Sequence, residues 1–227
     1  LCLKSGNAAL LRGGSEAAST NRATMAAMKG CFPEGAIQSI SGGHDEVGEL
    51  LAMDDLIDVV IPRGGEGLIR SVTEKSRIPV LKHYRGNCHV YVDGAADLDM
   101  AERIVENAKC QRPATCNAAE KVLIHESIAK AFVPRLEKFG VELRGDERAR
   151  SFLSMKAAEE EDWEEEYLDR ILGVRVVRNV DEAVAHIEKY GSGHTDAIVT
   201  SDEKTARRFL EEVDSATVIW NASTRLA

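Results

Sequence analysis

The sequence lacks the marks of several large classes of protein. Among its 227 residues no apolar run approaches the roughly 18 that a membrane-spanning helix requires. No block of Lys and Arg occurs and the formal net charge is −9. Nucleic acid is therefore not expected as a partner, because phosphate backbones are bound by clustered cations. No signal peptide is recognised either, and we expect a cytoplasmic protein without a membrane partner.

Cysteine is scarce and shows no paired pattern. The five cysteines are odd in number, and none forms a C-x-x-C pair or a His-rich spacing typical of a metal site. We therefore expect no metal and a reducing compartment. The cysteines are Cys2, Cys31, Cys88, Cys110 and Cys116.

Short apolar runs rich in β-branched residues alternate with amphipathic stretches. Repeated β-α units of this kind predict parallel sheets covered by helices. Strands are expected at residues 8–12, 36–40, 57–62, 80–81, 88–92, 121–125, 141–143, 174–177, 197–200 and 217–220. Helices are expected at residues 16–29, 45–53, 67–76, 97–109, 128–139, 181–190 and 203–213.

A polar, glycine-containing segment, residues 84–87, separates two groups of these units. It predicts two α/β domains, residues 1–86 and 87–227. The acidic run 159–166 is most simply a solvated loop or helix face.

Two glycine clusters each follow a predicted strand and open a predicted helix. Glycine permits close backbone approach, and the free N–H groups of a helix N-terminus favour an anion by about 0.3–1 kcal/mol. Neither cluster is a G-x-G-x-x-G or Walker motif, and a tight turn explains each of them as well. Together they suggest a nucleotide site. The residues concerned are Arg12, Gly13, Gly14 and Ser15 in the first cluster and Gly64 and Gly65 in the second.

The loop 111–117 places one thiol, Cys116, in polar and cationic surroundings just after a predicted helix. Arg112 precedes it by four residues and Asn117 follows it. The thiolate is the nucleophilic form of cysteine, and a nearby guanidinium or backbone N–H groups stabilise it. The alternative is a small buried hydrophobic residue, the usual fate of an unpaired intracellular cysteine.

Six segments of the chain carry a family resemblance. They read LCLKSGNAALLRGGSE, IPRGGEGLI, KCQRPATCNAAEKVLIH, EEYLDRILGV, YGSGHTDAIVT and WNASTR. In order and spacing they resemble the γ-glutamyl phosphate reductase family, a branch of the aldehyde dehydrogenase superfamily. The resemblance covers the chain from end to end. A full member resembles this chain extended at both ends, so we expect a central fragment that is inactive when isolated.

The resemblance implies an α/β, aldehyde dehydrogenase-like architecture. Residues 1–86 would be part of a Rossmann-like NADPH-binding domain, and residues 87–227 the catalytic domain. The implied reaction is the NADPH-dependent reduction of L-glutamyl 5-phosphate to L-glutamate 5-semialdehyde and phosphate, in proline biosynthesis. We expect a small-molecule substrate and a homo-oligomer.

The resemblance also implies roles at the reacting centre. Cys116 matches the nucleophile, which would expel phosphate and form a thioester that accepts hydride. Apart from the resemblance, the residue types themselves suggest two further roles. Asn117 would donate its side-chain amide or its backbone N–H to the thioester oxygen. Arg112 would bind the substrate carboxylate or the departing phosphate, with an ordinary surface arginine as the alternative.

The implied cofactor residues come from both predicted domains. Arg12, beside Gly13, Gly14 and Ser15, falls where a lysine usually reaches the adenosine ribose. Gly64 and Gly65 fall in the loop near the nicotinamide. Glu166 falls at the carboxylate that holds the nicotinamide ribose, in a register uncertain by one residue.

The turn after the last predicted strand would line the substrate pocket through Asn221, Ser223 and Thr224, and a purely structural turn is the alternative. Two rival functions also remain. A hydrolytic, NAD-dependent aldehyde dehydrogenase would carry a general-base Glu in residues 80–86, where this chain has no carboxylate and His83 is the only candidate base. A non-catalytic descendant that serves as a binding module is the other.

Overall fold

The computed structural model describes residues 2–40 and 42–227, so that Leu1 and Ser41 lie outside the described residues. The chain forms two compact units, Leu1–Lys82 and His83–Ala227. The second unit thus begins four residues before residue 87. None of the described helices combines the length and the hydropathy that a membrane span needs.

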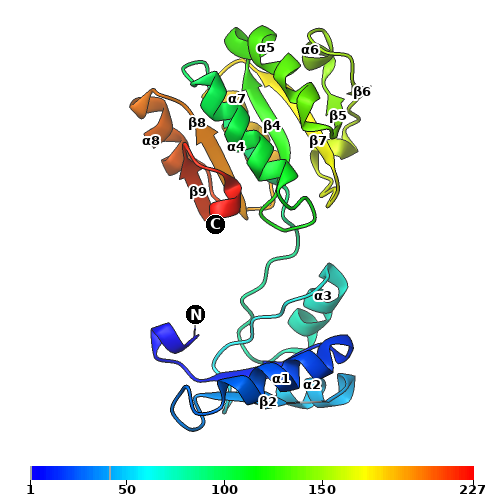
Figure 1. Cartoon of the computed structure of the whole chain (residues 1–227), viewed down its shortest axis with the longest axis vertical. Coiled ribbons are helices and arrows are strands. Elements are labelled where there is room, and N and C mark those ends of the chain that lie inside the picture. The colour runs from blue at the N-terminus through cyan, green and yellow to red at the C-terminus, as the bar shows by residue number, and fades with distance from the viewer. Residues whose placement is uncertain (1, 41) are drawn as a thin grey trace. The chain divides into compact units, whose positions relative to one another are not determined.

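Among its described residues, the first unit contains a short parallel sheet and three α-helices (Figure 1). Its elements are η1 (Cys2–Ser5), β1 (Ala9–Arg12), η2 (Ser15–Ala17), α1 (Ala18–Met28), β2 (Ile37–Ile40), α2 (His44–Leu50) and α3 (Glu66–Lys75). Strands β1 and β2 pair in parallel, and Arg12 lies opposite Ile40 at their carboxyl ends. The helix expected at 16–29 begins as the 3-10 turn η2.

The strand expected at residues 57–62 was a wrong prediction. The described chain has only an isolated parallel bridge between Val60 and Val80. Val60 donates to the carbonyl of Pro79, and Leu81 donates to the carbonyl of Val60, both at 2.9 Å. Proline has no N–H, so Pro62 and Pro79 interrupt the ladder on both chains.

The second unit is built on a seven-stranded sheet in the order β6-β5-β7-β4-β3-β8-β9. All neighbouring strands are parallel. The strands are β3 (Cys88–Val92), β4 (Ala119–His125), β5 (Glu142–Gly145), β6 (Lys156–Ala157), β7 (Ile171–Val177), β8 (Thr195–Val199) and β9 (Thr217–Trp220). The helices are α4 (Leu98–Cys110), α5 (Glu126–Phe132), η3 (Val133–Phe139), α6 (Glu147–Arg150), η4 (Glu161–Trp163), α7 (Val180–Tyr190), α8 (Glu203–Glu212) and η5 (Thr224–Leu226).

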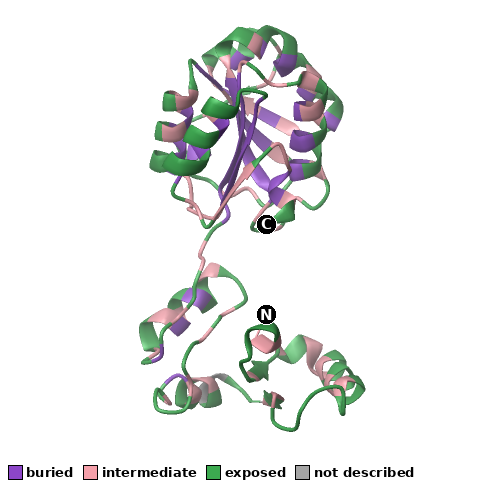
Figure 2. Ribbon diagram, turned by 90° about the vertical axis from the view of Figure 1, so that its left-hand side faces the viewer, coloured by how far each residue is buried: buried purple, intermediate pink, exposed green. Residues whose placement is uncertain are grey.

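Helices cover both faces of this sheet, and the buried residues concentrate along its strands (Figure 2). Side chains of successive strand residues alternate between the faces. Val90 and Val92 accordingly pack with Phe132 and other residues of α4, α5 and η3. Tyr91 packs on the opposite face with Phe209 of α8, ring centroids 6.1 Å apart. Burial on both faces explains why these strands read as continuous apolar runs.

Two expectations for the second unit need correction. The helix expected at 128–139 changes from α5 to the 3-10 helix η3 after Phe132, because Pro134 cannot donate to the α-helical ladder. The acidic run 159–166 is not simply solvated, since Asp162 and Trp163 within it are buried.

Candidate active site

The loop that carries Cys116 joins α4 to β4, so it lies at the end of the sheet where the parallel strands begin. We call this end the amino end of the sheet. Cys116 is exposed. The loop is closed on itself, because the hydroxyl of Thr115 donates to the carbonyl of Arg112 at 2.9 Å and the N–H of Ala118 donates to the carbonyl of Thr115 at 2.9 Å. The thiol is thus presented by an ordered turn.

Gly86, two residues before β3, packs directly against the backbone of Cys116. A Cβ atom at this position would lie 1.8 Å from the carbonyl oxygen of Cys116, which no real structure tolerates. The thiol of Cys88 donates to the same carbonyl at 3.2 Å. The segment that leads into β3 therefore fixes the backbone of Cys116 at two points, and only glycine fits at residue 86.

Glu166 joins this cluster from the segment before β7. Its Oε1 accepts a hydrogen bond from the N–H of Gly86 at 2.7 Å. Glu166 is half-buried, and its other carboxylate oxygen accepts no hydrogen bond from the described residues. Two residues that the sequence singled out, Cys116 and Glu166, are thereby brought together through one glycine.

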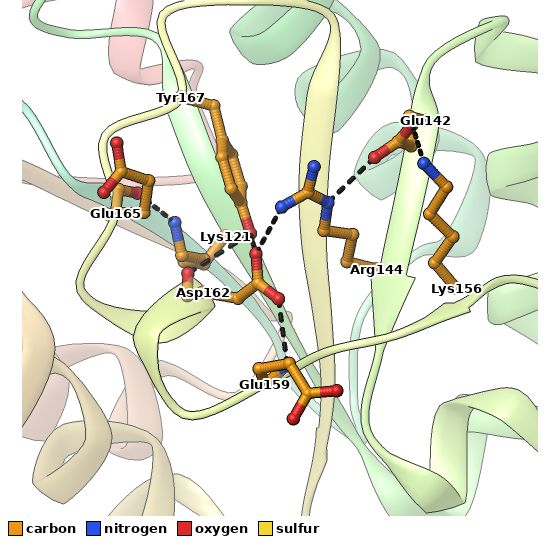
Figure 3. Close-up of polar contacts among 8 residues, drawn as sticks. All are labelled: Lys121, Glu142, Arg144, Lys156, Glu159, Asp162, Glu165 and Tyr167. Carbon is orange, nitrogen blue, oxygen red and sulfur yellow. Dashed lines mark hydrogen bonds and ion pairs between the residues drawn. The ribbon is translucent and has the colours of Figure 1, made fainter.

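A polar network holds the segment that carries Glu166 (Figure 3). Asp162 bonds with the guanidinium of Arg144 at 2.7 Å and accepts from the hydroxyl of Tyr167 at 2.9 Å. The ammonium of Lys121, on β4, donates to the carbonyl of Glu165 at 2.7 Å and lies 4.2 Å from the centroid of the Tyr167 ring. These contacts flank Glu166 on both sides, so they determine which carboxylate faces Gly86.

Burial shifts the pKa values of the charged residues at the start of β4. Lys121 is fully buried, and burial lowers its pKa from 10.5 to about 7. Burial raises the pKa of Glu120 from 4.5 to about 7, although the ammonium of Lys109, at 2.9 Å, opposes that shift. The sequence analysis assigned no role to these residues, and the polar letters inside the predicted strand were the only available signal.

The C-terminal turn reaches the same loop through a residue without a predicted role. Arg225 donates from Nη1 to the hydroxyl of Thr115 at 2.7 Å and from Nε to the side-chain oxygen of Gln111 at 3.2 Å. Arg225 therefore stabilises the loop of Cys116 through two hydrogen bonds. Asn117, next to the thiol, donates from its amide to the carbonyl of Ala227 at 3.3 Å.

The three predicted pocket residues of that turn differ in their surroundings. Asn221 accepts from the N–H of Thr200 and donates to its carbonyl, both at 3.0 Å, at the carboxyl end of the sheet. That end is roughly 15 Å from the amino end for a five-residue strand. Ser223 caps η5 by accepting from the N–H of Arg225 at 3.2 Å, and Thr224 is fully buried with no described partner for its hydroxyl. The structural alternative accounts for Asn221 and Ser223.

Arg112 and His83 complete the second unit's predicted residues. Arg112 is exposed, and its guanidinium makes no hydrogen bond or ion pair with the described residues. The Nε2 of His83 bonds with the carbonyl of Arg85, and the imidazole lies edge-on to that of His194 with centroids 4.3 Å apart. A carbonyl only accepts, so the proton is assigned to Nε2, and Nδ1 is the basic nitrogen of His83.

In the first unit, Arg12 lines a cavity of about 200 Å³ at the carboxyl ends of β1 and β2. Its guanidinium donates to the carbonyl of Gly42 at 3.1 Å. Glu46 and Glu49 line the same cavity. One cation and two carboxylates thus surround the space where the carboxyl-end rule for open α/β sheets places a nucleotide.

The two glycine clusters differ in their surroundings. A Cβ at Gly13 or Gly14 would meet the flexible end of the side chain of Asn21 or Glu16, respectively. Gly65 is the N-cap of α3 and has open space around it, with no side chain capping the helix. Its neighbour Gly64 lies against Leu68. The second cluster therefore leaves backbone N–H groups of a helix N-terminus uncapped by any side chain.

Among the residues that the structure describes, no three His, Cys, Asp or Glu side chains gather as metal ligands would. The chain can nevertheless be placed by comparison. The profile of the aldehyde dehydrogenase family matches residues 1–157, which is more than half of the chain. The chain belongs to the aldehyde dehydrogenase family.

Individual relatives show which members of the aldehyde dehydrogenase family the chain resembles. The γ-glutamyl phosphate reductase of Thermodesulfovibrio yellowstonii is 54% identical and aligns with 100% of this chain and 57% of its own length. That of Geobacter metallireducens is 53% identical, again over 100% and 57%. The chain thus spans a little over half the length of these curated relatives. The resemblance inferred from the six sequence segments is confirmed.

Solved structures agree on the fold. The crystal structure of γ-glutamyl phosphate reductase from Thermotoga maritima matches 100% of this chain and 57% of that chain, with a TM-score of 0.88 at 46% identity. An acetylating aldehyde dehydrogenase from Geobacillus thermoglucosidasius matches 98% of this chain and 60% of its own with a TM-score of 0.73, at 20% identity. The second likeness is one of fold alone. The predicted aldehyde dehydrogenase-like α/β fold with parallel sheets is confirmed.

Proposed function

We propose that the protein containing this chain reduces L-glutamyl 5-phosphate to L-glutamate 5-semialdehyde and phosphate with NADPH, in proline biosynthesis. The observation that carries the proposal is the exposed thiol of Cys116 on a loop fixed by Gly86 and Arg225, with the carboxylate of Glu166 beside it. The likeness to γ-glutamyl phosphate reductases across the whole chain supports the choice of substrate.

In this proposal the first unit, with residues 83–86 added, binds the cofactor, and residues 87–227 supply the thiol. The sulfur of Cys116 attacks the acyl carbon, the carbon–oxygen bond to phosphate breaks, and a thioester forms. Phosphate is a good leaving group, so no strong acid is required near the thiol. When bound, the nicotinamide supplies the hydride that reduces the thioester.

The chain's own residues position these events. Asn117 has a second amide N–H beyond the one bonded to Ala227, which makes it the proposed donor to the thioester oxygen. Arg112 presents an exposed guanidinium that suits a carboxylate or a phosphate. The free oxygen of Glu166 suits a ribose hydroxyl. Thr224 remains a proposed pocket residue, whereas Asn221 and Ser223 are already engaged by Thr200 and by the N–H of Arg225, respectively.

The cofactor proposal rests on the cavity beside Arg12 and on the uncapped N-terminus of α3 at Gly64 and Gly65. Arginine favours the 2′-phosphate of NADPH, whereas Glu46 and Glu49 in the same cavity oppose it and suit the ribose hydroxyls of NADH. We propose that Arg12 prevails. In the full-length protein, Arg12→Ala should lower kcat/KM with NADPH more than with NADH, while Glu49→Gln should shift the preference the other way. Equal effects of Arg12→Ala on both cofactors would overturn the preference.

The experiment that tests the main proposal is acyl-enzyme trapping in the full-length protein. Incubation with glutamate 5-semialdehyde and NADP⁺ without phosphate should leave a glutamyl group on Cys116, detected by peptide mass. Cys116→Ser should abolish it, and Cys31→Ala, an exposed cysteine of the first unit, should not. A glutamyl label on another residue, or turnover by Cys116→Ser, would refute the assignment. Lack of reactivity at Cys116 towards limiting iodoacetamide would favour a non-catalytic module.

The acyl acceptor, water or phosphate, distinguishes the hydrolytic alternative from the proposed reductase. Residues 80–86 carry no carboxylate, and the ring of His83 is held by Arg85 and His194. Without a positioned base, attack by water should lose the usual factor of about 10² to 10⁴. Semialdehyde oxidation should therefore depend on phosphate or arsenate, and a comparable rate without either would move the protein to the hydrolytic class.

We also propose that the full-length protein is a homo-oligomer. Light scattering of the full-length protein would test this proposal.

A further inference from the structure

Cys88 is a buried thiol that the proposed reaction does not use. It is the first residue of β3, and its side chain is fully buried. Its sulfur lies 3.2 Å from the carbonyl oxygen of Cys116. A second cysteine therefore touches the backbone of the residue that presents the exposed thiol.

The strand pairing explains why the two residues meet. Cys88 lies opposite Ala119 at the start of β4, and the register shifts between Cys88 and His89. Ala119 is three residues beyond Cys116, and Gly86 allows the two backbones to approach without a side chain between them. Because the sulfur of Cys88 already touches the backbone of Cys116, the approach of the two sulfurs that the proposal below needs is a rotation of the Cys116 side chain about its Cα–Cβ bond.

No other two cysteines among residues 2–40 and 42–227 make such a contact. Cys110 lies instead by the carbonyl of Phe139 at 3.9 Å, and Cys31 by that of Ala27 at 3.9 Å. All five cysteines are free. The proximity is thus specific to one exposed and one buried thiol.

We propose that Cys88 and Cys116 form a reversible disulfide when a peroxide oxidises Cys116. In the first step the sulfur of Cys116 attacks a peroxide oxygen, the O–O bond breaks, and Cys116 becomes a sulfenic acid while the peroxide is reduced to water or an alcohol. In the second step the sulfur of Cys88 attacks the sulfur of Cys116. The S–S bond forms, the S–O bond breaks, and the proton of Cys88 leaves with hydroxide as water. A dithiol reductant reverses the disulfide by exchange.

The surroundings of the two thiols determine which one is oxidised first and which one then attacks it. Cys116 is the exposed thiol and meets the oxidant, whereas Cys88 is buried and contacts the backbone of Cys116. Burial, and after it the charge of Asp196, raises the pKa of the Cys88 thiol. The thiolate is the attacking form, so disulfide formation should accelerate from neutral to mildly alkaline pH.

The disulfide would protect Cys116. Without a partner thiol, sulfenic acid proceeds to sulfinic and sulfonic acids, which thiol reductants do not reverse. With Cys88 as the partner, the sulfur of Cys116 forms a disulfide instead, and a dithiol reductant returns it to the thiol. The disulfide involves the thiol of Cys116 and not the proposed reduction, so it can be detected without turnover.

Peptide mass analysis of the full-length protein tests the proposal. Trypsin yields residues 86–103, which contain Cys88, and residues 110–121, which contain both Cys110 and Cys116. The variant Cys110→Ser leaves Cys116 as the only thiol of the second peptide. After treatment of this variant with hydrogen peroxide and alkylation of remaining thiols, the two peptides should appear linked, lighter by two hydrogens, and should separate with dithiothreitol.

The matched variant Cys88→Ala in the same background should give no linked peptide and should convert Cys116 to sulfinic acid, with loss of dithiothreitol recovery. Cys88→Ser serves if alanine disturbs folding, since it preserves the size of the side chain. Absence of the linked peptide in Cys110→Ser, together with equal sulfinic acid formation with and without Cys88, would overturn the proposal.

Discussion

The two units of this chain differ in how their apolar residues are used. In residues 83–227 the central strands β3, β4 and β8 are buried on both faces, whereas the buried apolar residues of the first unit are only Leu51, Ile69, Val72 and Ile78 among the described residues. Helix α1 buries no residue at all. Large apolar side chains that remain exposed in the first unit are Leu10, Leu11, Phe32, Leu56, Val59, Ile61, Leu68 and Leu81.

Because of this difference, the proposed catalytic thiol and the proposed cofactor residues lie on units with unequal cores. The thiol loop rests on a unit with a continuous core, which supports precise positioning of Cys116. The proposed cofactor residues rest on a unit whose buried apolar area is small, and buried apolar area is the main source of folding stability. In the 227-residue chain, stability should therefore reside almost entirely in the second unit.

The largest expected effect is on the units when they are separated. Residues 83–227 alone should unfold cooperatively in urea, because their core is intact without the first unit. Residues 1–82 alone should show no cooperative transition and should associate through exposed apolar side chains. A sharp urea transition for residues 1–82 would break the comparison.

Next in size is a truncation in the core. Phe132→Ala removes a fully buried side chain of α5 and should lower the unfolding free energy by about 3–5 kcal/mol. Leu10→Ala, in a residue that is 47% exposed, should change it by less than about 0.5 kcal/mol. Chemical denaturation of both variants gives the contrast, and similar losses would show that the first unit has a core of its own.

Buried charge sharpens the comparison further, because every buried charged side chain of the described residues lies in the second unit. The pKa of Lys121 falls from 10.5 to about 7 on folding. Between these values the unfolded chain holds the proton and the folded chain does not, so this group adds stability as the pH rises from about 7 towards 10.5. Below about 7 its burial cost is present in full.

Lys121→Met should remove that slope, by an amount on the order of a few kcal/mol at about 1.4 kcal/mol per pKa unit. Denaturant midpoints at neutral and alkaline pH would measure it. The exposed Lys130→Met is the control and should keep the wild-type profile. An unchanged slope in Lys121→Met would show that Lys121 keeps its proton when folded.

The smallest expected effects come from two glycines. Gly86→Ala places a Cβ on the carbonyl of Cys116 and should cost about 1–3 kcal/mol as an overpacked site. Gly67→Ala, in α3 of the first unit, meets open space and should gain about 0.4–1 kcal/mol. Thermal unfolding distinguishes the two signs. A neutral Gly86→Ala would show that the loop of Cys116 moves freely.

The sequence allowed most elements to be predicted because periodicity and turn residues report local structure. It did not reveal the loss of the strand at 57–62, since that depends on Pro62 and Pro79 interrupting the hydrogen bonds on either side of the Val60–Val80 bridge, a pairing that only the fold creates. The same holds for Asp162, whose acidic neighbours indicated a solvated face. Its burial requires Arg144 from another strand and Tyr167 from the loop.

The candidate site was predictable as single residues but not as an assembly. Cys116 and Glu166 were proposed separately, and nothing in their spacing indicates that Gly86 joins them. Arg225 had no assigned role, because the contact between a C-terminal turn and residue 115 spans most of the second unit's sequence. Long-range hydrogen bonds of this type leave no periodic trace in a sequence.

The contact between Gly86 and Cys116 also bears on protein engineering. The thiol loop is not a portable module, because its shape is set by residues that enter from β3, from the segment before β7 and from the C-terminal turn. Grafting residues 111–117 onto another scaffold would transfer the cysteine without its supports. A successful transplant would have to carry the glycine at 86, the carboxylate at 166 and the arginine at 225 together with the loop.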